Sequence, residues 1–336
     1  MGNTIAGDTV TAAAIPPPSV TDTFNDNTRI SAYKDCPRKF FLRHIMEWRS
    51  EGTAVPLVFG GSWHAGQDII WQHATVLQQD DLRQAAMAAF LEKWEEEGFP
   101  ADLDMDQIQA FNPRTPGVAE EMYANYIRER WGMLLNARIV SIEQPFAVPL
   151  PNLDHSWYVG RLDKVIEYNG QQLVIEHKTT ALYSKASGFQ PSYIDSWYVD
   201  SQVKGYQFGA GMYYEGLKSI WVDCALVHKV IHDQFRFVPV SHTFDMVKEW
   251  LRDTESWVTS MVKDEQRFLD TGNLSTTGCF RKNENSCYGK YGSCAFLDIC
   301  RTTSDIQKGQ EPPPGYIVEK WSPFETLGLE KIINKE

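Results

Sequence analysis

Apolar side chains recur at intervals of three and four residues through most of the first 135 residues, the spacing of helices with one buried face. Pro37 interrupts this spacing within residues 31–48, so we predict two short helices that meet near Cys36. One longer helix is predicted to begin after Gly60-Gly61, and two more are predicted over residues 81–97 and 117–135. The first part of the chain is therefore expected to be mainly helical.

The pattern changes after residue 136. β-branched and aromatic residues are concentrated over 138–148, 157–166 and 173–178, with turn residues between them, as expected for strands. A helical stripe returns over about 196–215, and two strands near 219–229 and 234–240 precede a long helix with an apolar stripe. This order predicts an α/β fold in which a central mixed sheet carries helices on both sides.

The two ends of the chain show no periodic pattern. Residues 1–24 are rich in Thr, Ala and Pro, and we predict a mobile tail there. Residues 25–302 are predicted to form one domain, with a helical part over about 25–135, a sheet core over about 136–270 and a cysteine-rich segment over about 271–302. Residues 303–336 are predicted to be a C-terminal extension.

Composition narrows the class of protein. The chain has 336 residues of which 43% are hydrophobic, enough for a sizeable core, and it has no run of about 18 apolar residues. We therefore expect a cytoplasmic protein without a membrane partner. The formal charge of −12 argues against general attraction to nucleic acid, although Arg38, Lys39 and Arg43 form a local basic patch. No nucleotide-binding glycine motif follows a strand, which disfavours a redox enzyme and a helicase.

Asn169-Gly170 is the strongest candidate turn in the chain, because Asn-Gly favours a two-residue hairpin loop. Such a loop pairs Tyr168 with Gln171, and the same register places Asp163 opposite Glu176. Paired residues share one face of a sheet with Cβ atoms about 4.5–5.5 Å apart. Lys178 projects from that face as well, since side chains of a strand alternate.

Two carboxylates and a lysine on one small patch suit a hard divalent cation such as Mg²⁺ or Mn²⁺, with Lys178 near a substrate phosphate or attacking water. The alternative interpretation is a surface hairpin whose charges are screened by water. The hairpin pattern alone leaves both interpretations open.

The chain presents His64 on a helix, then Gly160-Arg161-Leu162-Asp163, Glu176-His177-Lys178, and Gln202-Val203-Lys204-Gly205-Tyr206. Over residues 29–302 this order resembles the RecB-like branch of the PD-(D/E)XK nuclease superfamily, most of all its iron–sulfur members, which include AddB, CRISPR-associated exonucleases and phage-encoded relatives. The resemblance implies a restriction-endonuclease-like core.

By this resemblance, the metal ligands are expected to be His64, Asp163, Glu176 and the backbone carbonyl of His177. Lys178 is expected to be the catalytic lysine, and Gln202 and Tyr206 match the family's QxxxY motif. Two simpler roles remain open: His64 as a packed histidine and Tyr206 as a core residue on the apolar stripe of its helix.

Four of the six cysteines lie within residues 279–300, and Cys287, Cys294 and Cys300 are separated by six and five residues. Three thiolates require a fourth ligand. The resemblance supplies Cys36, within Cys36-Pro37-Arg38-Lys39-Phe40, and implies a [4Fe–4S] cluster. Zinc is the alternative metal for four thiolates, and Cys279 is the alternative ligand. Cys224 lies in an apolar strand and is expected to be a core residue.

These observations predict a Mg²⁺- or Mn²⁺-dependent deoxyribonuclease, with the family favouring an exonuclease that acts on single-stranded or frayed DNA ends, in a bacterial or phage-infected cell. The alternative is a non-hydrolytic DNA-binding or assembly subunit of a recombination, repair or CRISPR complex. In either case the expected partner is a helicase, a recombinase or a CRISPR integration protein.

Overall fold

The computed structural model describes residues 18–19, 21–52, 54–217, 219–289 and 292–333. The chain divides into two compact units that are interleaved along the sequence. Unit 1 comprises Met1–Gly52, Pro145–Arg161 and Thr243–Glu336, and unit 2 comprises Thr53–Gln144 and Leu162–His242. The predicted N-terminal tail lies mostly outside the described residues, and its last two residues belong to strand β1 (Thr23–Asn25).

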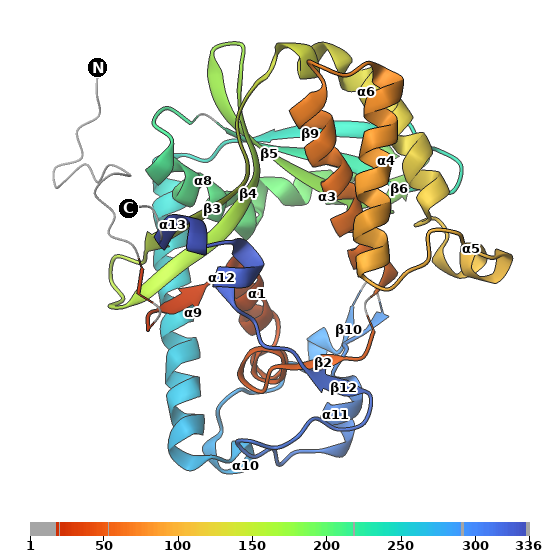
Figure 1. The fold of residues 1–336 in the computed structure, drawn as a ribbon. Coiled ribbons are helices and arrows are strands. Elements are labelled where there is room, and N and C mark those ends of the chain that lie inside the picture. The colour runs from red at the N-terminus through yellow and green to blue at the C-terminus, as the bar shows by residue number, and fades with distance from the viewer. Residues whose placement is uncertain (1–17, 20, 53, 218, 290–291, 334–336) are drawn as a thin grey trace. The chain divides into compact units, whose positions relative to one another are not determined.

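A mixed sheet organises unit 2 (Figure 1). Strand β4 (Ser156–Tyr168) pairs antiparallel with β5 (Gln171–Thr180), which pairs parallel with β8 (Ser219–Leu226), and β8 pairs antiparallel with β9 (Phe235–Val240). Strand β3 (Arg138–Pro149) pairs with β4, and a short hairpin joins β6 (Tyr183–Ser184) to β7 (Gly188–Phe189). The predicted strands and the mixed character of the sheet are confirmed.

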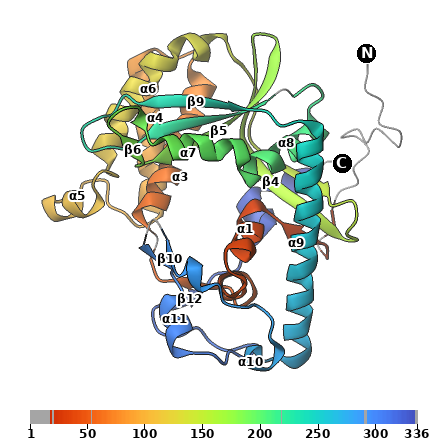
Figure 2. The same ribbon diagram turned by 180° about the vertical axis from the view of Figure 1, so that it is seen from behind.

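Helices lie on both sides of this sheet (Figures 1 and 2). Helices α3 (Val55–His73), α4 (Gln79–Glu96) and α6 (Pro116–Asn136) share an apolar core with Ile166, Leu173 and Ile175 of the sheet. Helix α5 (Met105–Phe111) precedes α6, while α7 (Pro191–Ser196) and α8 (Ser201–Tyr213) precede β8. The predicted start of α3 after Gly61 is wrong: the helix begins at Val55, with Pro56 in its first turn, and both glycines lie inside it.

The hairpin between β4 and β5 has the predicted geometry. Asn169 and Gly170 have φ values of 50° and 72°, the left-handed pair that a type I′ turn requires. The ladder runs from Tyr168–Gln171 back to Lys164–Ile175, which confirms the predicted register over five pairs. The ladder ends there, one pair before Asp163 and Glu176.

Unit 1 contains the first and last segments of the chain and five of the six cysteines, all but Cys224. Helix α1 (Asn27–Asp35) stops at Cys36, which is extended, and α2 (Pro37–Phe40) continues as a π-helix over Phe41–Ile45, so the predicted break at Pro37 is confirmed. The other helices and strands of unit 1 are β2 (Trp48–Ser50), α9 (Phe244–Thr271), α10 (Leu274–Thr277), β10 (Tyr288–Gly289), β11 (Gly292–Ser293), α11 (Leu297–Thr302), β12 (Tyr316–Val318), α12 (Pro323–Leu327) and α13 (Glu330–Ile333). Among the described residues, none of the helices has the length and apolar character to span a membrane.

Candidate active site

Strand β5 places two charged side chains on the face that α8 approaches. Glu176 and Lys178 alternate with Ile175 and His177, so they project away from the core shared with α3, α4 and α6. Glu176 is 2% exposed, and its Oε1 accepts hydrogen bonds from Lys178 Nζ and from Gln202 Nε2, the latter at 2.9 Å. Gln202 Nε2 also lies 2.9 Å from the Tyr206 hydroxyl, as expected for residues four apart on a helix.

Asp163 completes this cluster from β4. Its Oδ2 accepts a hydrogen bond of 2.8 Å from the backbone N–H of His177 and lies 3.4 Å from Nδ1 of His64, which comes from α3. The structure thus brings together the predicted residues of unit 2: His64, Asp163, Glu176, His177, Lys178, Gln202 and Tyr206.

Burial makes the charges of the site strongly interdependent. Burial and then the Asp163 charge raise the pKa of Glu176 to about 7. Burial also acts to raise the pKa of Asp163, but the His64 interaction and the Lys178 charge outweigh it and hold that pKa well below its usual range. The pKa of Lys178 is raised, because the two carboxylates outweigh the effect of its burial. Lys178 therefore keeps its positive charge inside the site.

One oxygen of the site stands out. Glu176 Oε2 is buried and has no hydrogen-bond partner among the described residues, although a buried carboxylate oxygen is costly to leave unpaired. Hard cations prefer carboxylate oxygens, so this donor set fits Mg²⁺ or Mn²⁺ chemically. As the side chains are placed, no group of three or more His, Cys, Asp or Glu among the described residues is arranged to hold a metal ion.

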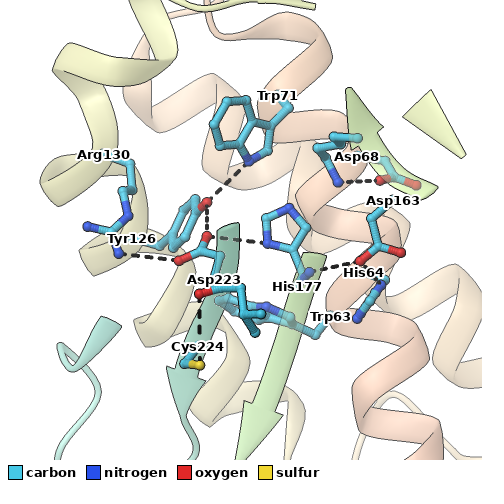
Figure 3. A network of polar contacts seen from close by, with 12 residues as sticks. Trp63, His64, Asp68, Trp71, Tyr126, Arg130, Asp163, His177, Asp223 and Cys224 are labelled. Carbon is cyan, nitrogen blue, oxygen red and sulfur yellow. Dashed lines mark hydrogen bonds and ion pairs between the residues drawn. The ribbon is translucent and has the colours of Figure 1, made fainter. Parts of the chain in front are cut away.

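A buried polar network supports the other side of β5 (Figure 3). Asp223 of β8 accepts a hydrogen bond of 2.6 Å from the Tyr126 hydroxyl and forms an ion pair with Arg130 at 3.3 Å. Nδ1 of His177 lies 3.3 Å from Asp223 Oδ2, and burial followed by the Lys164 charge lowers the pKa of His177 to about 4. His177 is therefore a neutral histidine fixed beneath the strand that carries Glu176 and Lys178.

Sequence reasoning missed this network and a neighbouring ion pair. Lys164 is fully buried and binds Asp68 of α3 at 2.7 Å, one helical turn after His64. Each contact has a sequence signal: Asp223 is the one acidic residue in the apolar strand IWVDCALV, and Asp68 follows His64 by four residues. A charged residue inside an apolar strand indicates a buried partner.

The four predicted cluster ligands line one cavity in unit 1. Cys36, Cys287, Cys294 and Cys300 contribute to its wall together with Lys39 and Lys282. Cys36 Sγ lies 3.4 Å from the backbone N of Asn283, and burial raises the pKa of Cys300 against the opposing charges of Lys282 and Arg38. Cys279 is buried beside Thr277 and does not line this cavity, and Cys224 is fully buried in β8 as expected.

Comparison with known proteins identifies the family. The PD-(D/E)XK nuclease superfamily profile matches residues 27–301, which include every residue of the site and the cysteine cavity. The chain belongs to this superfamily. No curated protein matches it.

Solved structures similar to this chain include two proteins described as exonucleases. A candidate exonuclease from Eubacterium rectale is 15% identical with a TM-score of 0.45, over 84% of this chain and 90% of its own. An alkaline exonuclease from Laribacter hongkongensis is 12% identical with a TM-score of 0.29, over 60% of this chain and 91% of its own.

Proposed function

We propose that this chain is a metal-dependent DNA nuclease that hydrolyses phosphodiester bonds. The observation that carries the proposal is the buried cluster of Asp163, Glu176 and Lys178, in which Glu176 Oε2 has no hydrogen-bond partner in the described part of the chain. Membership of the PD-(D/E)XK superfamily agrees with this chemistry.

Each residue has a role that follows from its contacts. Gln202 and Lys178 hold Oε1 of Glu176, which leaves Oε2 for a cation, and the His177 N–H orients Asp163. Asp163, Glu176 and His64 would hold Mg²⁺ or Mn²⁺, which supplies positive charge to the scissile phosphate and activates water. Lys178 stabilises the negative charge that develops on the phosphate, because the carboxylates keep it protonated.

Cleavage of end-labelled DNA tests this function. Wild-type protein, purified without oxygen, is incubated with single-stranded and duplex DNA in Mg²⁺ or Mn²⁺, beside Lys178→Ala and a metal-free control. We expect metal-dependent cleavage that falls about 100-fold or more in the variant, the scale of losing one charge-stabilising group. Binding without cleavage in either metal would instead support the non-hydrolytic DNA-binding subunit.

We further propose that Cys36, Cys287, Cys294 and Cys300 hold a [4Fe–4S] cluster. Their common cavity supports this assignment, and the nearby charges of Lys282 and Arg38 oppose the rise that burial causes in the pKa of Cys300. The resemblance to iron–sulfur nucleases favours iron over zinc, which suits four thiolates equally.

The finer functional assignments rest on the same resemblance. We propose that the nuclease belongs to the RecB-like branch, acts in the cytoplasm on single-stranded or frayed DNA ends, and works with a helicase, recombinase or CRISPR integration protein. A duplex with one frayed end, compared with a closed duplex of the same sequence, distinguishes digestion from an end from internal cleavage.

A further inference from the structure

Two chain segments leave the sheet side by side, one from the end of β5, which carries Glu176 and Lys178, and one from the end of β8. Strands β5 and β8 are parallel and pair Thr180 with Leu226 at their carboxyl ends, so both chains leave at the same edge. The backbone N–H of Val227 donates a hydrogen bond of 2.7 Å to the Thr180 carbonyl, which holds the two segments together where they leave the sheet. Ligands of α/β sheets commonly bind at this edge.

An aromatic pair lies directly beyond this junction. The rings of Tyr183 and His228 have centroids 4.7 Å apart and are inclined by 43°. Nδ1 of His228 accepts hydrogen bonds of 3.2 Å from the backbone N–H groups of Val230 and Ile231, which fixes the imidazole. Tyr183 is 37% exposed and Val230 is 76% exposed. The pair therefore presents a rigid, partly apolar surface to solvent.

The two chain segments that carry this pair differ in charge from the chain as a whole. Residues 177–194 and 224–232 contain no Asp or Glu, in a protein of net charge −12. The same segments carry Lys185 and Lys229, both exposed, and neither forms an ion pair with another described residue. An aromatic surface flanked by lysines suits a single-stranded nucleic acid, whose bases stack and whose phosphates need cations.

The reach of the chain places this surface close to the reaction centre. Tyr183 is the fifth residue after Lys178, so their Cα atoms are at most about 17 Å apart. At the roughly 3.4 Å rise of a stacked strand, this distance corresponds to about five nucleotides or fewer.

We propose that Tyr183, backed by His228, is a stacking platform for one base of the single-stranded DNA substrate, with Lys185 and Lys229 contacting the adjoining phosphates. This inference rests on the proposed nuclease function and adds a substrate-binding site to it. Stacking is tolerant of sequence because every base has a π-face, so the platform selects unpaired strands and not particular bases.

The test measures binding of a fluorescent single strand to full-length Lys178→Ala protein, with and without Tyr183→Leu, and Tyr183→Phe as the matched control. We expect Tyr183→Leu to weaken binding by about 5- to 150-fold, the range for loss of one stacked base, and Tyr183→Phe to retain it. Strands with a single abasic nucleotide, moved one position at a time, should bind the parent protein more weakly at one position. Tyr183→Leu should abolish that position dependence.

Two results would overturn the inference in different ways. Unchanged binding and an unchanged abasic profile in Tyr183→Leu, in a protein whose Lys178-containing form cleaves DNA, would refute the platform alone. Failure of the Lys178-containing form to cleave DNA, together with no binding of any strand, would refute the nuclease function and the platform with it. Equal unfolding midpoints of the three proteins would show that the differences arise from binding.

Discussion

At the scale of single residues, the site is governed by the burial of Glu176. A carboxylate with one oxygen held by Lys178 and Gln202 and the other without a partner is electrostatically unfavourable when no cation is bound. Burial and then the nearby Asp163 charge raise the pKa of Glu176 to about 7, so the metal-free protein keeps this group protonated at a pH where an exposed glutamate is ionised.

This pKa predicts how pH affects stability without metal. Between pH about 4.5 and 7 the unfolded chain releases the Glu176 proton while the folded chain keeps it, so this group destabilises the folded state as pH rises. The contribution is on the order of 3 kcal/mol. His177, with its pKa of about 4, affects the pH dependence of stability in the opposite direction. The measurement therefore compares wild type with a variant that retains His177.

Denaturant unfolding of wild type and Glu176→Gln in chelator should isolate that contribution. We expect the unfolding free energy of wild type to fall relative to the variant as pH rises through this window. Curves that run parallel from pH about 4.5 to 7.5 would contradict the raised pKa. Added Mg²⁺ should reduce the difference, because a cation stabilises the ionised carboxylate.

At the scale of elements, the position of α3 decides where His64 lies. The helix packs closely on α4 and α6 at Gly66, two residues after His64. A Cβ atom at Gly66 would overlap the Tyr123 side chain and lie 2.8 Å from the Ala86 backbone carbonyl. Glycine is therefore required at this position because Tyr123 and the Ala86 carbonyl approach the α3 backbone closely. The position of His64, on the same helix, depends on this packing.

Two alanine substitutions in α3 test this packing. Gly66→Ala should destabilise the protein by about 1–3 kcal/mol, the usual cost of overpacking. Gly61→Ala, in the same helix but with open space around it, should stabilise by about 0.5–1 kcal/mol because alanine favours helices. The unfolding midpoint of each variant is the measurement, and equal shifts of both would contradict the packing argument.

At the scale of the whole molecule, the chain order interleaves the two units, and unit 1 brings together segments that are about 250 residues apart. Cys36 follows α1, whereas Cys287 and Cys294 precede α11 and Cys300 lies in that helix. A shared metal centre would restrict the unfolded chain over this long loop, which stabilises the folded state by several kcal/mol if the reasoning for disulfides applies.

The substitution Cys36→Ala tests whether the four cysteines hold a shared metal centre. In protein purified without oxygen, we expect loss of the bound iron, loss of visible absorbance and a lower unfolding midpoint. Cys279→Ala, outside the cavity, should retain the iron and the absorbance. Stoichiometric zinc in wild type would establish the alternative metal, and iron that survives Cys36→Ala would exclude Cys36 as a ligand.

The sequence alone determined the local features of this protein. The Asn169-Gly170 turn fixes the hairpin register, because both residues tolerate positive φ, and Pro37 breaks the helix at Cys36. The order of His64, Asp163, Glu176, Lys178 and Gln202 along the chain predicted the site that the fold assembles. The turn and the helix break depend on a few neighbouring residues, which is why spacing and turn chemistry were sufficient for them. The grouping of His64 and Gln202 with the hairpin residues was implied by the family resemblance.

Only the tertiary structure decided which groups are buried together. Asp223, Tyr126 and Arg130 come from β8 and α6, about 90 residues apart, and no local pattern links them. The β4–β5 ladder ends before Asp163, and the Asp163 carboxylate accepts a hydrogen bond from the His177 N–H. Tyr183 contacts His228 only because β5 and β8 end side by side. Desolvation and pairing across the sheet depend on the packed neighbours of each group, and sequence spacing does not contain that information.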